Sequence, residues 1–356
     1  MKRFISYILP FCLLVLDLGA QSLNSPESII WDNQTRNFLI SNAADGNIQS
    51  VSESGNTSIF SKEVKGSHGI CFYGLYSVVS CYKDEIHVAD RLTGRMIRKH
   101  KIPGALFLNG ICYDGKSTIY ASDFSKRKIF KLENIDSSRP ILTVICSLDR
   151  APNGIAYNEL DQELVVMTWG SQASILHIST NQGKIIKSFQ TSLSNLEAVI
   201  SDGDNGFYLT SWVPGGLYHY DGNQIKSMNE TYEQATGLAL NGKSELFVLS
   251  SLDKRLKAQP IPVEERQKAE EEVNLSAFPN PMSINSLISY ELPEGGAVNI
   301  SVYDCQGNLI ERLVMEKKAP GKHSFFYDRG NKSSGLYFIN IQTSYGNKAI
   351  AVTLVD

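Results

Sequence analysis

The sequence predicts an all-β protein, a six-bladed β-propeller followed by a small β-sandwich. Three observations carry this prediction. A strand-like segment recurs six times, each copy is followed by further strand-like runs at a nearly constant offset, and the composition changes after Pro262. Repeats of about 40 residues with about four strands each are typical of propellers, in which every blade packs against its neighbours. The alternative for the repeat region is a second β-sandwich, which would not require equal periods.

Each repeat opens with a polar residue, then a small residue, then an alternating strand. The six copies begin 41, 41, 44, 44 and 39 residues apart. They read ESIIWD, HGICFY, NGICYD, NGIAYN, EAVISD and TGLALN. Later runs rich in Val, Ile, Tyr and Phe, separated by Gly, Asn and Asp, indicate strands joined by turns. The sixth repeat lacks a clear outer strand, for which residues 21–26 and the following linker are both candidates.

The residue that opens each repeat has a predicted place in three dimensions. The first strand of each blade lines the central channel of a propeller, so equivalent positions lie at one height around it. These six residues should therefore form one ring at a channel mouth, which we name the polar ring. Its members are Glu27, His68, Asn109, Asn153, Glu197 and Thr236. The small residue after each should let neighbouring inner strands approach closely.

Two carboxylates and two amides in this ring favour a hard divalent cation. Ca²⁺ accepts carboxylates, amide carbonyls and waters together. Without a cation, one of two nearby carboxylates would take up a proton. The alternative is a hydrated channel mouth, in which Asn109 and Asn153 are turn residues before Gly and His68 is a hydrogen-bonded channel residue. Trp169 and Trp212, at matching strand ends, are expected to pack, to cap or to rim a pocket.

The segments PESIIWD, LNGICYD, PNGIAYN and NLEAVISDGDNGFYLTSW resemble the senescence-marker-protein/gluconolactonase propellers, over roughly residues 24–262. Related NHL and strictosidine-synthase-like propellers share the strand pattern. In the resembled family a divalent metal, often calcium, is held by a Glu of blade one, an Asn of blade four and an Asp of blade five. The resemblance implies Glu27, Asn153 and Glu197 as metal ligands and Asn109 as a substrate contact. The family's usual blade-five Asp-Gly is Glu-Ala here.

The resemblance also implies hydrolysis of a sugar lactone or a related ester. The metal would polarise the carbonyl, Glu197 would act as general base and Asn109 would orient the substrate. His68, outside the family's usual ligand set, is a second candidate base or substrate contact. The other function class is a non-catalytic binding propeller that recognises a glycan or a protein, since a fold alone carries no function.

The first 20 residues, MKRFISYILPFCLLVLDLGA, are typical of a secretory signal peptide. A positive start precedes an apolar run, and cleavage is expected after Ala20, leaving a propeller over residues 21–262. A membrane anchor is the weaker alternative, because the run is short and Asp17 interrupts it. No later segment predicts a transmembrane span in the mature chain. No basic stripe indicates a nucleic-acid partner, at a net charge of -3.

The mature chain would keep five cysteines, an odd number that forbids complete intrachain pairing. No CxxC spacing indicates a zinc site. Buried thiols are the expectation, with one optional disulfide among Cys71, Cys81 and Cys112.

A charged linker, residues 263–273, precedes a different module in residues 274–356. Short strands alternate there with Gly and Pro turns, which predicts about seven strands in a small β-sandwich. The pieces PNP, ISYELPEGG, VYDCQGNLI, SSGLYFINIQT and KAIAVTLVD resemble the type A C-terminal sorting domain of the type IX secretion system. The resemblance implies the secretion machinery as a partner and export through the periplasm and across the outer membrane. The protein would then be secreted or held at the cell surface, often with the tail removed. An ordinary adhesive sandwich is the alternative.

Overall fold

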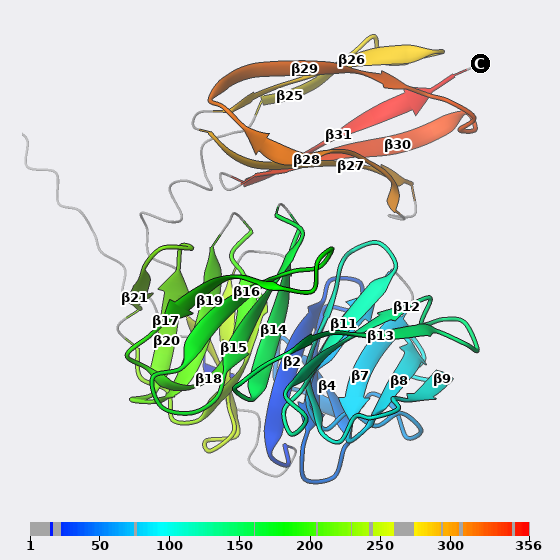
Figure 1. The fold of residues 1–356 in the computed structure, drawn as a ribbon. Helices are drawn as coiled ribbons and strands as arrows, with labels where there is room; N and C mark the ends of the chain where they lie inside the picture. The colour runs from blue at the N-terminus through cyan, green and yellow to red at the C-terminus, as the bar shows by residue number, and fades with distance from the viewer. Residues whose placement is uncertain are drawn as a thin grey trace, which may run out of the picture.

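The protein is all-β in the part of the chain that the computed structural model describes (Figure 1). The described residues are 15–16, 23–74, 77–159, 161–203, 206–228, 230–241, 245–259, 274–292, 295–305, 309–343 and 346–355. Most of the predicted signal peptide and the whole of the predicted linker lie outside these ranges. Within them, no helix is long and apolar enough to cross a membrane.

The first three repeats form three antiparallel sheets of four strands each. Blade one comprises β2 (Pro26–Asp32), β3 (Asn37–Asn42), β4 (Ile48–Ser52) and β5 (Thr57–Ile59). Blade two comprises β6 (Ile70–Tyr73), β7 (Ser77–Tyr82), β8 (Glu85–Asp90) and β9 (Met96–Lys101). Blade three comprises β10 (Leu108–Tyr113), β11 (Thr118–Asp123), β12 (Lys128–Glu133) and β13 (Ile141–Ser147).

The next two repeats have the same strand order, and the sixth differs at its outer edge. Blade four comprises β14 (Pro152–Asn158), β15 (Glu163–Thr168), β16 (Ser174–Ser179) and β17 (Ile185–Gln190). Blade five comprises β18 (Ser194–Ser201), β19 (Phe207–Val213), β20 (Gly216–Tyr220) and β21 (Ile225–Ser227). Blade six comprises β22 (Ala235–Leu240), β23 (Leu246–Ser250), β24 (Arg255–Gln259) and β1 (Val15–Leu16).

The outer strand of blade six is therefore residues 15–16, which lie upstream of residues 21–26, the upstream candidate. The other candidate, the linker, lies outside the described residues. In β1, Val15 pairs with Lys257 and Leu16 with Leu256 of β24. β1 lies within the predicted signal peptide, so cleavage after Ala20 would remove it from the blade.

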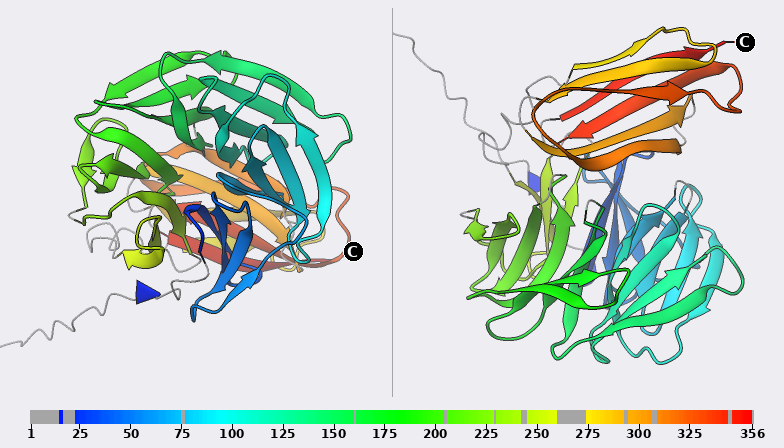
Figure 2. Two further views of the ribbon diagram at one scale, coloured as in Figure 1. Left: turned by 90° about the horizontal axis from the view of Figure 1, so that it is seen from below. Right: turned by 45° about the horizontal axis from the view of Figure 1, so that its top comes forward.

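The blades are held together by one hydrophobic cluster at each of the six blade-to-blade interfaces. β3 shows how the alternation of side chains along a strand supplies two of these clusters at once. Phe38 and Ile40 face blade six, whereas Leu39, on the opposite face, packs toward blade two. Such strands read as nearly continuous apolar runs because both of their faces are covered. The ring closes where Phe38 meets Phe247 with ring centroids 4.7 Å apart, and Figure 2 shows the blades arranged around one axis.

The C-terminal domain is a sandwich of two antiparallel sheets. The three-stranded sheet comprises β25 (Asn274–Phe278), β26 (Asn285–Leu292) and β29 (Gly321–Asp328). The four-stranded sheet comprises β28 (Leu309–Lys318), β27 (Gly296–Asp304), β30 (Gly335–Thr343) and β31 (Gly346–Leu354). Inward-facing residues of both sheets, such as Ile288, Tyr290 and Ile339, form one core. The predicted seven-stranded sandwich is thus confirmed.

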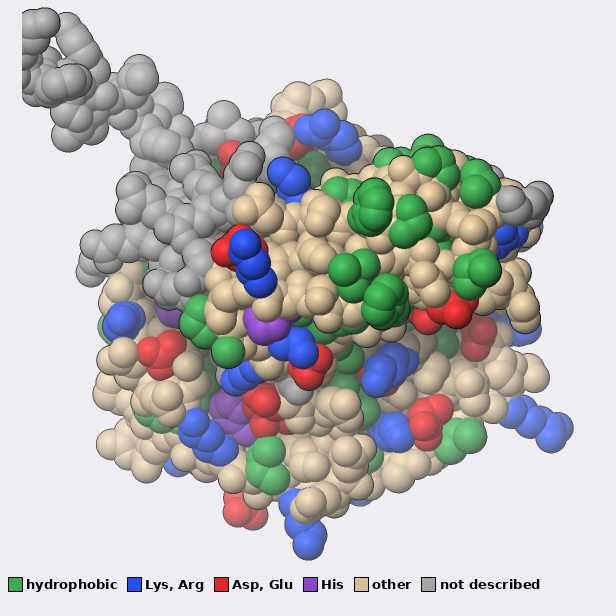
Figure 3. Space-filling model, turned by 90° about the horizontal axis from the view of Figure 1, so that it is seen from above, with side chains coloured by type: hydrophobic (Ala, Val, Ile, Leu, Met, Phe, Trp, Pro, Cys, Tyr) green, Lys and Arg blue, Asp and Glu red, His purple; other side chains and the backbone are tan. Residues whose placement is uncertain are grey.

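One row of side chains on the outer face of the smaller sheet is apolar. Phe278, Leu287 and Phe326 are neighbours in register across its three strands, and both Phe side chains are largely exposed. Figure 3 shows apolar side chains gathered on this side of the molecule.

The sandwich lies against one end of the propeller (Figure 1). Arg312 of β28 donates to Glu159, with Nη1 to Oε2 at 3.1 Å. Glu159 follows the last residue of β14, whereas the polar-ring residue Asn153 lies at the start of that strand. The contact is therefore at the channel end opposite the polar ring, which leaves the ring's mouth uncovered by the sandwich.

Candidate functional site

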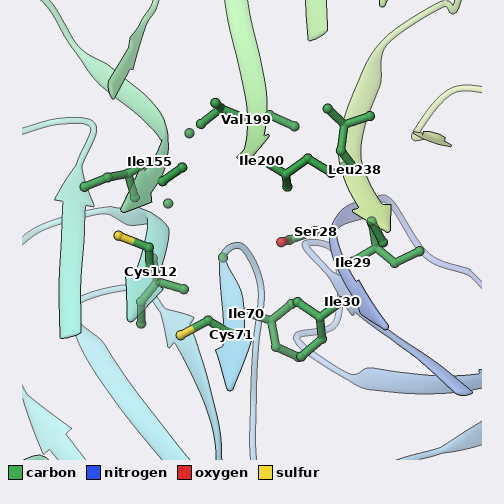
Figure 4. A pocket seen from close by; sticks show the side chains of 18 of the residues that line it. Ser28, Ile29, Ile30, Ile70, Cys71, Cys112, Ile155, Val199, Ile200 and Leu238 are labelled. Carbon is green, nitrogen blue, oxygen red and sulfur yellow. The ribbon is translucent and has the colours of Figure 1, made fainter. Parts of the chain in front are cut away.

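All six members of the polar ring line one cavity along the propeller axis, of about 450 Å³. Each ring residue lies near the start of an inner strand, as the repeat predicted; His68 lies two residues before β6, and Glu197 is the fourth residue of β18. Further along the same strands the lining is mostly apolar, with Ile70, Ile155, Val199 and Leu238 converging around the axis in Figure 4. The cavity thus has a polar mouth and an apolar wall.

The thiols of Cys71 and Cys112 also line this cavity (Figure 4). Both are free, as are Cys81, Cys146 and Cys305, so the optional disulfide is not formed. Burial raises the pKa of the Cys71 thiol well above its usual value and also raises that of Cys112. These thiols are protonated and unreactive at neutral pH.

Close approach of the inner strands explains the small residue after each ring position. The amide of Gly69 donates to the carbonyl of Asn109 in the next blade at 2.7 Å. A Cβ built on Gly154 would lie 2.2 Å from the carbonyl oxygen of Glu197. Side chains at these glycines would collide with neighbouring backbone, so the small residues bring successive ring members together.

The three residues that the resemblance implied as metal ligands come from blades one, four and five. Asn153 Nδ2 donates to Glu197 Oε2 at 2.8 Å and to the carbonyl of Leu196 at 3.2 Å. Asn153 is only 2% exposed, and its Oδ1 is buried with no hydrogen-bond partner. Glu27 lies close enough for its charge to raise the pKa of Glu197. An orphaned amide oxygen therefore lies beside the buried carboxyl group of Glu197 and near the half-buried carboxyl group of Glu27.

Burial dominates the electrostatics of the ring. It raises the pKa of Glu27 to about 7. Burial, then repulsion from Glu27, raises the pKa of Glu197 well above its usual range, against a smaller opposing effect of the Asn153 hydrogen bond. Burial lowers the pKa of His68 to about 4, so this imidazole is neutral at pH 7. Without a cation the ring therefore holds a neutral histidine and at least one protonated carboxyl, as expected for two carboxylates that must share a site.

These shifts predict a pH-dependent stability for the metal-free protein. Folding raises the pKa of Glu27 from 4.5 to about 7, so the folded state holds this proton more tightly than the unfolded state. The stabilisation is complete below pH 4.5 and is lost as pH rises to about 7, at a cost of about 3 kcal/mol. Urea unfolding with a chelator at pH 5 and pH 8 measures it. Glu27→Gln should flatten this part of the profile, and an unchanged slope in that variant would contradict the prediction.

The remaining ring members have different environments. His68 Nδ1 lies 2.8 Å from Ser67 Oγ. Its ring meets Phe107 edge-on, with centroids 4.5 Å apart. Thr236 Oγ1 donates to the carbonyl of Pro26 at 2.9 Å, joining blade six to blade one. Thr236 thus has a structural contact, whereas His68 faces the cavity as a neutral group.

An aromatic feature lies beside the ring, of which the sequence analysis named Trp169 and Trp212 as candidates to rim a pocket and missed Phe107 and Phe124. Phe107 contacts Phe124, Phe124 contacts Trp169, and Trp169 contacts Trp212, each edge to face, with centroids 6.0, 6.0 and 5.1 Å apart. We name these four residues the aromatic arc. A sequence signal existed, because Phe124, Trp169 and Trp212 all directly follow the core of the second strand in their repeats.

The atoms of the polar ring fit a metal ion in part. No group of three or more His, Cys, Asp or Glu side chains in the described ranges is placed to hold a metal ion. The candidate set has two carboxyl groups and one amide, and its unpartnered Oδ1 atom is an oxygen of the kind that Ca²⁺ accepts. In chemistry and burial, these residues fit a hard divalent cation.

Comparison with known proteins identifies the C-terminal domain. Residues 276–353 match the family model for the secretion system C-terminal sorting domain. No curated protein sequence matches the chain. The sorting domain indicates interaction with a secretion machinery and export across the outer membrane.

The propeller is similar in fold to several solved structures. A gluconolactonase from Xanthomonas campestris aligns with TM-score 0.53 and 16% identity, covering 67% of this chain and 87% of that one. A catalytically inactive virginiamycin B lyase from Staphylococcus aureus, solved with quinupristin, aligns with TM-score 0.52 and 13% identity, covering 70% and 99%. A protein of unknown function from Bacteroides thetaiotaomicron aligns with TM-score 0.52 and 11% identity, covering 66% and 69%.

Identities at this level show a shared fold. The chain is therefore a six-bladed propeller, similar in fold to gluconolactonase and virginiamycin B lyase, that carries a secretion-system C-terminal sorting domain for delivery to the cell surface or the medium.

Proposed function

We propose that the propeller is a divalent-metal-dependent hydrolase of lactones or related esters, with Glu27, Asn153 and Glu197 as metal ligands. One observation carries the proposal. One buried and one half-buried carboxyl group and an unpartnered amide oxygen, from three blades, share the mouth of one cavity. Among the described residues no Lys, Arg or His contributes to the pKa of either carboxyl group.

Such an arrangement is costly without a partner of opposite charge. A buried carboxylate loses its hydration and is tolerated only when it is paired, hydrogen-bonded or protonated. Ca²⁺ would satisfy both carboxylates and the orphaned Asn153 oxygen at once. When bound, the cation would supply Lewis-acid polarisation of the lactone carbonyl.

The protein's own side chains would transfer the proton and orient the substrate. Glu197 would accept a proton from water as the water oxygen bonds to the carbonyl carbon of the lactone. The ring C–O bond then breaks, and the proton held by Glu197 passes to the leaving oxygen. Asn109 would orient the substrate, and neutral His68 would contact it. Glu197 accepts a proton only when ionised, which is also the form in which it would hold the cation.

Calcium titration of the purified, metal-free protein tests the proposed site. Calorimetry at pH 8 should show one saturable event, and Glu27→Gln should weaken binding at least tenfold because it removes one of two anionic ligands. Glu53→Gln, at an exposed carboxylate, is the control and should bind like the wild type. Absence of heat, or equal heat in wild type and Glu27→Gln, would end the metal proposal. A panel of alkyl, aryl and sugar lactones then tests the reaction.

A non-catalytic binding propeller is the second candidate. It is favoured by the bond between Asn153 and Glu197, which already satisfies part of the ring without a ligand. Under this alternative, surface loops would recognise a glycan or a protein, and calcium would have no effect on any lactone. Calcium binding with no hydrolysis across the panel would favour it.

A further inference from the structure

We infer that the aromatic arc is a binding subsite for a hydrophobic, ring-bearing group of the substrate, so that aryl esters or aryl lactones are favoured over sugar lactones. This inference rests on the proposed function and deepens it, because it names the substrate class for the same site. The arc adjoins the cavity through Phe107, whose ring contacts the ring residue His68. The inference concerns binding and is tested separately from hydrolysis.

The strand registers place the arc directly above the polar ring. The amide of Phe124 donates to the carbonyl of Phe107 at 2.9 Å, and Phe107 lies two residues before the ring residue Asn109. The amide of Trp169 donates in the same way to Ala151, two residues before the ring residue of blade four. In blade five, Ser194 pairs with Val213 and Leu196 with Ser211, which sets Trp212 opposite Asn195, two residues before Glu197.

The arc covers only one half of the mouth. The position equivalent to Phe124, Trp169 and Trp212 is Ala43 in blade one and Ser251 in blade six. There the amide of Ala43 donates to the carbonyl of Ser25, and the amide of Ser251 donates to the carbonyl of Gln234. A ring of aromatic side chains that merely closed the fold would be expected in all six blades. Confinement to blades three, four and five instead produces one aromatic wall beside Asn153 and Glu197.

The arc is anchored and has an unused polar group. Asp123 Oδ2 accepts from the amides of Leu106 and Phe107 at 2.6 and 3.3 Å, which fixes the loop that carries Phe107. Trp212 Nε1 is buried without an acceptor among the described residues, so this indole is not committed to a hydrogen bond with them. All four arc side chains are partly exposed. The arc is therefore held in place and partly accessible at the mouth.

The chemistry around the arc argues against a sugar ring. Leu106 and Val213, which flank the arc, are 57% and 53% exposed, and the wall below the polar ring is apolar. A sugar lactone would leave several hydroxyl groups against these surfaces without hydrogen-bond partners. An aromatic ring attached to a single carbonyl would instead place its ring on the arc by edge and face contacts and its carbonyl at the polar ring.

The test uses the full exported protein and probes that separate binding from hydrolysis. The ketone 2-tetralone has an aryl ring beside a carbonyl and cannot be hydrolysed, and cyclohexanone is its counterpart without the aryl ring. Calorimetry should show 2-tetralone binding more tightly than cyclohexanone. Trp169→Ala should weaken 2-tetralone about five- to tenfold and leave cyclohexanone unchanged. Trp169→Phe should restore most of the affinity, and Phe326→Ala, on the sandwich, should have no effect.

The outcomes distinguish the two levels of the proposal. If 2-tetralone binds and Trp169→Ala weakens this binding, but no lactone is hydrolysed, the subsite would be supported and the proposed hydrolase activity would be contradicted. Hydrolysis of gluconolactone in preference to dihydrocoumarin, with no effect of Trp169→Ala or Phe124→Leu, would overturn the subsite and keep the hydrolase. Failure of 2-tetralone to bind the folded wild-type protein would also overturn the subsite.

Discussion

Replacing Glu197 with glutamine is expected to reduce lactone hydrolysis by a factor of about 10²–10⁴, the usual contribution of a general base. The substitution keeps the size of the side chain and its place beside Asn153, but it removes the group that accepts the proton. Calcium binding should strengthen as pH increases, because burial and Glu27 raise the pKa of Glu197 in the metal-free ring and only the ionised carboxylate is a ligand. Initial rates at saturating calcium measure the loss of activity, and calcium titrations between pH 6 and pH 9 measure the pH dependence of binding.

A second buried carboxyl group serves as the control for this experiment. Glu163 of blade four pairs with His177 at 2.5 Å and does not line the cavity. Glu163→Gln should therefore keep the rate of the folded protein within about twofold, even if stability falls. Full activity in Glu197→Gln would refute its role as the base. If calcium binding were also unchanged in that variant, the binding-propeller alternative would be favoured.

Replacing Arg91 with leucine is expected to destabilise the protein by about 3–5 kcal/mol, the effect of removing one partner of a buried ion pair. Arg91 Nη2 lies 2.5 Å from Asp32 Oδ1, and the side chains are 8% and 1% exposed. The guanidinium also lies over the ring of Phe72, 4.1 Å from its centroid. Burial alone would raise the pKa of Asp32, but hydrogen bonds from Arg91 and backbone amides lower it below its usual value. Without Arg91 the carboxylate would remain buried and unpaired in charge.

Urea unfolding at pH 7 measures this loss. Arg36→Ala is the matched control, since Arg36 pairs with Glu53 at a similar distance, 2.9 Å, but with side chains 61% and 37% exposed. Exposed pairs contribute little, so this control should cost under about 1 kcal/mol. The double variant Arg91→Leu with Asp32→Asn should recover part of the stability. A loss below about 1 kcal/mol in Arg91→Leu alone would show that the pair does not hold blades one and two together.

Much of the propeller could be predicted from local patterns. The strand period and the repeat length follow from side-chain alternation and turn residues, and both are visible along the chain. The polar ring followed from the repeat alone, because equivalent residues of a closed ring must face one axis. The small residue after each member was also interpreted correctly, and the 2.2 Å approach at Gly154 shows why.

The strand that completes blade six could not be predicted in this way. Val15–Leu16 lies in an apolar run whose composition indicates a signal peptide, and only pairing with β24 gives it a place in the sheet. Phe107 and Phe124 of the aromatic arc were missed for a related reason. They come from different turns, and no pattern within either turn indicates that the two turns lie side by side in the fold.

Side-chain alternation, turn chemistry and repeat spacing were enough to specify a propeller followed by a small sandwich, because these signals act between residues close in the chain. Export was inferred from the composition of the first 20 residues and from the resemblance of the tail to a sorting domain. The extent to which burial raises the pKa of Glu27 and Glu197, the orphaned oxygen of Asn153 and the one-sided aromatic wall followed only from the tertiary structure. Each of these features depends on burial and on residues from other blades, and the distances between those residues are set only when the six blades close into a ring.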